Sequence, residues 1–550
     1  MYAAGFDRCE NVGFTLPNHS QRLLEWAPRI FFGFAIVLQL QTGFATLPGD
    51  LIQADPPTHF TTGVMLHDFL RSGQPLRPFP FAECFYVHYP KVAFGHWPPV
   101  FYILEALWFF VFGAKIVAAR WLCACITAVC AVALYRRCRI DWGQWSALSV
   151  TALFLALPLI RQQTWLVMSD LLVAGFMFLA LCSLSDYLNT ARISNALWLA
   201  LWSSLAILTK GTGWLLLGPI AAAPLLTGRF RMYRSRGYWL AVALTCAASA
   251  PFYLWMNRLN LGYPVGFEWQ LHRLRMLLPV LLALKWLAVA IVLIAILALA
   301  LYRFLPRKPL QRTQTTVAVF LVWGLVLAAF ITLFPLTPEL LRYFIPAIAP
   351  AAYLLAAIVI IPYGKPLACV VCAGLLAAFV PLPVNSTTAY SQAVGTIPRA
   401  PGHIILVESD SGGEGALIAA HLQRDPQRST YMLRGTKFLE ISDWSGAHFT
   451  PKYSTAAAVR AALESVGPDY IVVDTSAPPT SDARLLMEVV QGSADRWNPI
   501  ARIPVKLSFR SGELLVYRRE PPSGRPGAPP SVQLGPERGL QTFSCKTWQD

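Results

Sequence analysis

The sequence predicts a polytopic α-helical membrane protein with about 11 transmembrane helices and a C-terminal extracytoplasmic α/β domain. Two observations carry this prediction. The chain has 550 residues, of which 55% are hydrophobic and only 13% are charged, too few charges to solvate a soluble protein of this length. Long apolar runs recur as far as residue 383, and short strand-like runs then alternate with amphipathic helical patterns.

The apolar runs have lengths that suit bilayer-crossing helices, which need roughly 20 apolar residues, or fewer where protein shields their ends. The candidate runs are residues 28–47, 97–113, 115–135, 144–160, 166–187, 195–209, 213–227, 237–256, 277–302, 315–334, 343–361 and 366–383. They delimit a transmembrane domain of residues 28–383, preceded by a polar leader of residues 1–27.

The distribution of Arg and Lys decides which runs cross. Basic residues concentrate in the leader and in residues 136–139, 229–236 and 303–312. Cytoplasmic loops carry such an excess, and all four segments share the cytoplasmic side only if residues 97–113 do not cross. That run opens with "HWPP", whose prolines suit a helix start exposed to water. We therefore expect a re-entrant or interface-lying helix there, within a first outer loop of residues 48–114.

This topology gathers polar residues on the non-cytoplasmic side. Asp55 in the first outer loop, the turn from Arg161 to Asp170, Lys210, the loop of residues 257–276 and Arg342 all fall there. The sequence therefore predicts one outward-facing polar site.

Residues 384–518 change character. "HIILVES", "DYIVVDT" and "ELLVYRR" are strand-like, and "GALIAAHLQ", "TAAAVRAALESV" and "DARLLMEVVQGS" are amphipathic helical patterns between them, which predicts an α/β domain. An odd number of spans starting inside places it outside. Residues 519–550 are rich in Pro, Gly and Ser and are expected to be a disordered tail.

The net charge of +16 does not indicate nucleic-acid binding. The basic residues lie in short clusters between apolar runs, as membrane topology requires. Membrane lipids are the expected surroundings.

Five segments follow one another as landmarks: "ADPPTHFTTGVMLHDFL", "HWPPVFYILEALWFFVFG", "SDLLVAGFMFLAL", "ILTKGTGWLLL" and "RYFIPAIAP". In this order they resemble GT-C membrane glycosyltransferases of the glycosyltransferase 39 kind, relatives of protein O-mannosyltransferases and of the lipid A aminoarabinose transferase. The resemblance extends from residue 28 to about residue 360 and leaves the C-terminal domain unassigned.

The resemblance implies an enzyme of a bacterial inner membrane that transfers a hexose or pentose from a polyprenyl-phosphate carrier, with inversion, to an acceptor hydroxyl outside the cytoplasm. The acceptor, whether lipid, polysaccharide or protein, is left open. It also implies that the first-loop Asp is the general base, that cationic residues hold the lipid phosphate, and that some members use a divalent metal ion. Many relatives have Asp-Glu in this loop, whereas Pro56 follows Asp55 here, so the metal requirement stays open.

Asp55 and Asp170 are the candidate catalytic residues. A general base must lie within hydrogen-bond reach of the acceptor hydroxyl; the alternative role for Asp55 is to cap a helix that starts near Pro57. Asp170 opens an otherwise apolar helix, where a carboxylate is costly. It is a candidate partner for a metal ion or for a cation of the site, and the alternative is a hydrated Asp at the headgroup boundary.

Lys210 and Arg342 are the candidate phosphate ligands, with His59 and Tyr343 as further substrate-binding candidates. Fixed positive charge stabilises a phosphate leaving group; the alternative for both cations is snorkelling to the interface. His96, Glu268 and His272 are candidate metal ligands, since Glu268 and His272 would share one helix face, and His59 and Glu83 could contribute. The alternative is that these are unrelated loop residues.

Two other classes of function are consistent with the spans. A transporter or lipid flippase predicts charged residues near mid-bilayer and broken helices in matched halves. A non-catalytic scaffold would present the outer domain to a partner.

Overall fold

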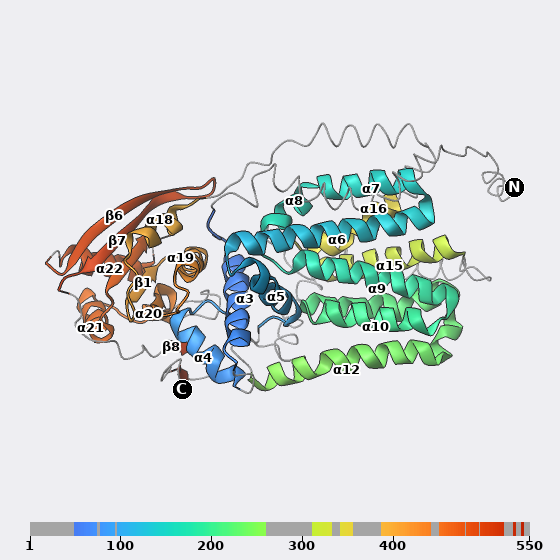
Figure 1. Ribbon diagram of the computed structural model, residues 1–550, viewed down its shortest axis with the longest axis horizontal. Coiled ribbons are helices and arrows are strands. Elements are labelled where there is room, and N and C mark those ends of the chain that lie inside the picture. Colours follow the sequence, from blue (N-terminus) through green and yellow to red (C-terminus); the bar gives the residue numbers. More distant parts are fainter. Residues whose placement is uncertain are drawn as a thin grey trace, which may run out of the picture.

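The computed structural model describes residues 49–73, 77–93, 96–259, 311–332, 342–355, 387–441, 450–478, 480–493, 495–521, 532–534 and 541–543. Three parts follow one another along its long axis (Figure 1). A helix bundle forms one end, the helices of the first outer loop form the middle, and an α/β domain forms the other end.

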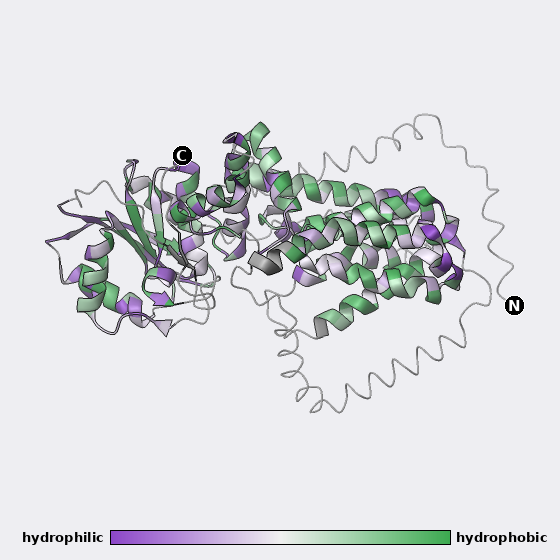
Figure 2. Ribbon diagram, turned by 90° about the horizontal axis from the view of Figure 1, so that it is seen from below, coloured by the Kyte–Doolittle hydropathy of each residue, from purple (hydrophilic) through white to green (hydrophobic). Residues whose placement is uncertain are grey.

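The bundle is built from apolar helices that lie side by side (Figure 1), and most of its helical ribbon has the colour of hydrophobic residues (Figure 2). Its longer members are α6 (Ile116–Trp142), α9 (Asp170–Thr190), α10 (Ile193–Ile207), α12 (Arg236–Leu259) and α15 (Arg312–Thr332). Shorter members are α7 (Gln144–Ala156), α8 (Pro158–Trp165), η2 (Gly211–Leu216), α11 (Leu217–Leu226), η3 (Phe230–Arg234) and α16 (Ile345–Leu355).

Four helices within the described residues, α6, α9, α12 and α15, are long and apolar enough to cross a membrane. The chain is thus a polytopic membrane protein, as predicted. The predicted spans at residues 28–47, 277–302 and 366–383 lie outside the described residues, so the count of eleven stays a prediction.

Prolines divide helices that the apolar pattern joins. The run of residues 144–160 was expected to be one helix, but α7 ends at Ala156 and α8 begins at Pro158. Leu157, with ψ 127°, is extended because the ring of a following proline disfavours the helical region. The predicted span at residues 166–187 likewise begins only at Asp170, after the extended residue Leu166.

The middle part consists of α3 (Asp55–Arg71), α4 (Pro78–His88) and α5 (Val100–Phe112). Helix α3 runs across the direction of the bundle helices (Figure 1). Helix α5 has 13 residues, about 20 Å at 1.5 Å per residue, which is shorter than a hydrocarbon core of about 30 Å. This length fits the expected interface-lying helix better than a span.

The α/β domain is a mixed five-stranded sheet in the order β2-β1-β5-β7-β6. Strands β1 (Ile404–Glu408), β2 (Tyr431–Arg434) and β5 (Tyr470–Asp474) are parallel, and β7 (Ser511–Arg519) joins β5 and β6 (Trp497–Lys506) antiparallel. Its helices are α18 (Ala389–Thr396), α19 (Ser411–Arg424), α20 (Gly435–Phe438), α21 (Ala456–Val466) and α22 (Ser481–Gln491).

Two minor sheets accompany it. They are the pair β3 (Glu440–Ile441) and β4 (Thr450–Pro451), and the pair β8 (Val532–Leu534) and β9 (Gln541–Phe543). The second pair lies within residues 519–550, the segment expected to be a disordered tail.

Glycines let helix α19 approach the first outer loop. A Cβ on Gly412 would lie 2.2 Å from the carbonyl oxygen of Ile52, and one on Gly415 would lie 2.6 Å from the ring of Pro57. The glycine-rich turn "SDSGGEG" therefore serves close packing, and Asp410 caps the helix by accepting from Gly413 N.

Buried polar contacts fix the α/β domain on this loop. Asp50 accepts from the backbone N–H groups of Tyr390 and Ser391. The Tyr89 hydroxyl donates to Asp425 at 2.7 Å, and Arg428 pairs with Asp68 at 2.8 Å. Such bonds, formed away from water, resist relative movement of the two parts.

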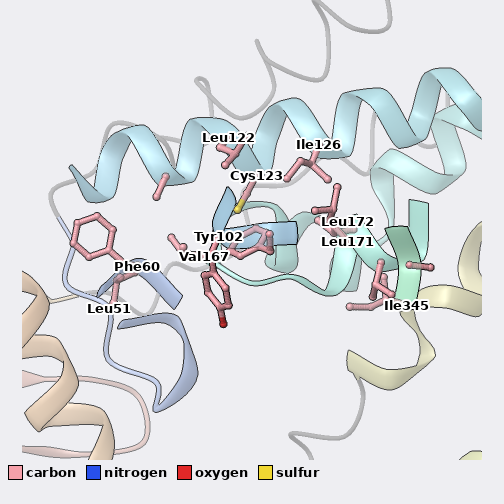
Figure 3. Packing of buried hydrophobic residues seen from close by; sticks show 14 of the residues in the cluster. Leu51, Phe60, Tyr102, Leu122, Cys123, Ile126, Val167, Leu171, Leu172 and Ile345 are labelled. Carbon is pink, nitrogen blue, oxygen red and sulfur yellow. The ribbon is translucent and has the colours of Figure 1, made fainter. Parts of the chain in front are cut away.

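The hydrophobic core continues from the outer loop into the bundle. Side chains of α3 and α5 meet those of α6, α9 and α16 (Figure 3). The labelled members of this core are Leu51, Phe60, Tyr102, Leu122, Cys123, Ile126, Val167, Leu171, Leu172 and Ile345. The first turn of α3 is therefore held against the bundle by packing.

Candidate active site

Two ion pairs meet where α3 lies against the bundle. Arg342 Nη1 lies 2.5 Å from Asp55 Oδ2, and Lys210 Nζ lies 2.7 Å from Asp170 Oδ1. The Tyr343 ring lies beside both cations, with its centroid 5.1 Å from Lys210 Nζ and 5.7 Å from Arg342 Cζ. We call Asp55, Asp170, Lys210, Arg342 and Tyr343 the paired cluster.

Asp55 is the first residue of α3. Ala54 occupies the capping position, so Asp55 is not the helix cap, and its carboxylate accepts from Arg342 instead. Pro56 and Pro57 fill the next positions, where a helix tolerates the missing N–H. A carboxylate in the first turn also interacts favourably with the helix dipole.

Asp170 and Lys210 lie at the broken ends of bundle helices. Asp170 is the first residue of α9. Lys210 is extended, with φ −156°, between α10 and η2. Gly213 permits this break, because a Cβ there would lie 2.5 Å from the backbone nitrogen of Ile207. The interruption turns the lysine toward Asp170.

His59 supports the cluster from the next turn of α3. Its ring stacks on Trp97 with centroids 4.3 Å apart, and its Nδ1 is 2.9 Å from the Tyr102 hydroxyl. His59 is almost fully buried. Helix α5 therefore braces the face of α3 that carries His59.

Electrostatics keep Asp55 ionised and the neighbouring histidines neutral. Burial alone would raise the pKa of Asp55, but Arg342, His59 and Lys210 outweigh it and hold that pKa below the usual 3.8. Burial lowers the pKa of His59 to about 3 and that of His96 to about 4. At neutral pH Asp55 is thus a carboxylate, and His59 and His96 carry no charge.

The paired cluster keeps unused hydrogen-bonding capacity. Within the described residues, Asp170 Oδ2 and Arg342 Nε have no hydrogen-bond partner. The side chains of Asp55 and Arg342 are 23% and 25% exposed. Because a guanidinium carries five N–H donors and an ammonium three, both cations could bind an anion while keeping their carboxylates.

The described residues contain no group of three or more His, Cys, Asp and Glu side chains that could hold a metal ion. His96 lies near Asp55 but packs against Trp97, and Glu83 is exposed on α4. Glu268 and His272 lie outside the described residues. The arrangement seen does not fit a metal site, and the metal-ligand predictions stay untested.

Three residues of this region were missed as site residues: Trp97, Tyr102 and Glu105. Glu105 is fully buried, and its carboxylate faces Gly63 of α3. A carboxyl group in an apolar helix was a usable signal for Glu105. Tyr102 gives no such signal, because its contact with His59 depends on how α5 packs on α3.

The chain has sequence similarity to a known family in its middle segment. Residues 96–255 match the family described as dolichyl-phosphate-mannose-protein mannosyltransferase. No curated protein matches the chain. Asp170 and Lys210 lie inside the matched segment, and Asp55 and Arg342 lie outside it.

Among solved structures, ArnT from Cupriavidus metallidurans in the apo state is similar, with 15% identity, a TM-score of 0.49, and coverage of 90% of this chain and 98% of that one. The same protein bound to undecaprenyl phosphate gives 14% identity, a TM-score of 0.46, and coverage of 89% and 97%. An Archaeoglobus fulgidus oligosaccharyltransferase in complex with Zn and sulfate gives 13% identity, a TM-score of 0.49, and coverage of 81% and 68%.

The match over residues 96–255 includes three of the five landmark segments on which the predicted resemblance rests. It therefore confirms that resemblance: the chain is similar to the GT-C membrane glycosyltransferases.

Proposed function

We propose that the chain transfers a sugar from a polyprenyl-phosphate carrier to an acceptor hydroxyl on the non-cytoplasmic face of a bacterial inner membrane. The observation that carries this proposal is the paired cluster, a partly exposed set of two carboxylates and two cations where the bundle meets the outer loop. The family match over residues 96–255 supports the reaction class.

Arg342 and Lys210 are assigned to the carrier phosphate. Transfer leaves a phosphate with an additional negative charge, and fixed donors aimed at that charge lower the barrier. Arg342 Nε and the remaining N–H groups of Lys210 would donate to the phosphate oxygens. Asp170 holds Lys210 in place, and Tyr343 packs beside both cations.

Asp55 is assigned as the general base. It accepts the proton of the acceptor hydroxyl as that oxygen attacks the anomeric carbon, and the bond from this carbon to the phosphate oxygen breaks. A single displacement of this kind inverts the configuration. Arg342 is paired with Asp55, and the negative charge of a phosphate bound to the same guanidinium would raise the basicity of Asp55.

One observation supports the outward orientation of the site, and another disfavours a transporter. Cys84 on α4 is disulfide-bonded, and disulfides persist in oxidising compartments outside the cytoplasm. The paired cluster lies at one end of the bundle, at the first residue of α9, whereas a transporter is expected to bind its substrate near mid-bilayer.

The test compares Asp55→Asn with Asp68→Asn, a matched change on the same helix. The purified full chain in proteoliposomes is given a radiolabelled polyprenyl-phosphate-linked sugar and an envelope extract, and labelled product and free carrier phosphate are measured. Loss of a general base typically costs 10²–10⁴-fold in rate, so Asp55→Asn should lose product by about that factor and Asp68→Asn should not. Equal turnover by Asp55→Asn and the unaltered chain would contradict the assigned base. No turnover by the unaltered chain would favour a non-catalytic scaffold.

A further inference from the structure

The α/β domain contains a pocket that shares no lining residue with the paired cluster. Its walls come from β2, α20, α21, the residues after β4 and Pro90 of the outer loop. Its volume is about 320 Å³, within the ~300–1,000 Å³ usual for small-molecule sites. The function proposed above makes no use of it.

The pocket wall is positively charged. Arg434, Lys437 and Lys452 line it, and none of the described residues that line it is Asp or Glu. Glu414 lies behind the wall, where it accepts from Arg434 Nε at 2.7 Å. Glu440 also lies near Lys437, and Asp482 lies near Tyr453, so the lining is basic although carboxylates stand behind it.

Arg434 offers an unused donor. Its side chain is 1% exposed, and its Nη1 points to the carbonyl oxygen of Pro90 at 3.5 Å. Its Nη2 has no hydrogen-bond partner within the part of the chain that the structure describes. An unsatisfied buried N–H of a charged group is costly, and an anion in the pocket would remove that cost.

Lys452 provides a second fixed cation. Its Nζ donates to the carbonyl oxygen of Lys437 at 2.6 Å, which leaves two N–H donors. Burial lowers the pKa of Lys452, so its charged form is stabilised less than in water. A bound anion would stabilise it.

Two aromatic rings also line the pocket. The rings of Phe438 and Tyr453 lie with their centroids 6.4 Å apart and 51° between their planes. Aromatic faces pack well on the C–H faces of a sugar ring, and the Tyr hydroxyl adds a polar end. The combination of anion donors and rings suits a charged sugar better than a free inorganic ion.

We propose that this pocket binds an acidic saccharide, a sugar that carries a carboxylate or a phosphate. Arg434, Lys437 and Lys452 surround the anionic group, and Phe438 and Tyr453 pack against the sugar ring. The site adds a second ligand to the protein, in a domain for which the family resemblance predicts nothing. It does not depend on the reaction proposed for the paired cluster.

The test uses the full-length chain in nanodiscs with the Asp55→Asn change, so that transfer cannot consume a probe. Saturation-transfer NMR measures binding of four probes: glucuronate, glucose 6-phosphate, glucose and inorganic phosphate. At least one acidic sugar should bind, with glucose and inorganic phosphate at least tenfold weaker. Lys452→Gln and Tyr453→Ala should each weaken the acidic sugar about tenfold.

A matched control is Lys506→Gln, an exposed lysine on β6 of the same domain, which should bind as the parent chain does. Arg434 is left intact, because its removal would leave Glu414 buried and unpaired. Glucose or inorganic phosphate binding as tightly as the acidic sugars would overturn the proposal. So would unchanged binding in a Lys437→Gln, Lys452→Gln double variant. The relative binding of glucuronate and glucose 6-phosphate then shows whether the pocket prefers a carboxylate or a phosphate.

Discussion

Helix α9 contributes to an ion-pair cluster at each end, and the two clusters differ in the exposure of the cations Arg342 and Arg137. At its first residue Asp170 belongs to the paired cluster. Near its last turn Asp186 belongs to a second cluster, about 24 Å away at 1.5 Å per residue. There Arg137 contacts Asp186 at 2.8 Å, Asp141 at 2.7 Å and the Thr316 hydroxyl at 2.5 Å.

The central cation of the second cluster is shielded from solvent, although Asp186 is 32% exposed. Arg137 and Asp141 are 5% and 1% exposed, and the Tyr353 hydroxyl donates to Asp141 at 2.8 Å. These contacts join α6, α9, α15 and α16. In the paired cluster, by contrast, the cation Arg342 is 25% exposed. Charge at the end of a membrane helix therefore does not by itself indicate a site; a cation that an anion can reach does.

The largest expected effect is on the free energy of unfolding, when the second cluster is changed. Arg137→Met removes the cation that Asp141 and Asp186 share, and breaking a buried pair typically costs about 3–5 kcal/mol. We expect a correspondingly lower unfolding free energy, measured by denaturant unfolding in detergent. Transfer per folded molecule should be unchanged, and a loss of turnover with normal stability would reverse the comparison.

Removing a charge pair from the paired cluster should instead lower the rate of transfer and leave stability unchanged or higher. A double change, Lys210→Met with Asp170→Leu, replaces a buried pair by apolar groups and is expected to be neutral or stabilising. It removes one donor to the leaving phosphate, and loss of such a donor costs about 10²–10³-fold in rate.

Steady-state transfer and thermal unfolding of this double variant are measured side by side. A stable and inactive protein is the expected result. A stable protein with full activity would show that Lys210 and Asp170 form only a structural pair.

The smallest effect concerns pH. Burial lowers the pKa of His59 from 6.5 to about 3, so between these values the unfolded chain binds a proton that the folded chain does not. This residue therefore reduces stability as pH falls below about 6.5. His59→Asn removes that loss. As pH falls below 6.5, the unfolding free energy of the parent chain should therefore fall by about 1 kcal/mol per pH unit relative to that of the variant. Thermal unfolding of both proteins from pH 7 to pH 4.5 measures this difference in unfolding free energy. A difference that does not change with pH would contradict a lowered pKa of His59.

Several parts of the site could be predicted from sequence because they depend on local or topological rules. The positive-inside rule placed Asp55, Asp170, Lys210 and Arg342 on one side, and the structure brings their side chains together. The strand-like runs after residue 400 coincide with β1, β5 and β7. The break at Pro158 was not predicted, because the apolar pattern of residues 144–160 was given more weight than the constraint that proline places on the residue before it.

Contacts between distant segments could not be predicted in this way. Nothing in the apolar pattern specifies that Lys210 pairs with Asp170 and Arg342 with Asp55, since the alternative pairing satisfies the same charges. Glycines between a strand and a helix, as in "SDSGGEG", could also cradle an anion, and only the proximity of Gly412 to Ile52 and of Gly415 to Pro57 shows that they serve packing. Such facts follow from tertiary structure.

The proposed function depends most directly on where the carrier phosphate binds. A polyprenyl phosphate with a photoreactive group on the isoprene unit next to the phosphate is crosslinked to the purified chain, and the labelled peptides are identified by mass spectrometry. We predict labelling near Asp55, Lys210 and Arg342. Labelling confined to the end of the bundle that contains Arg137 and Asp186 would contradict the proposal.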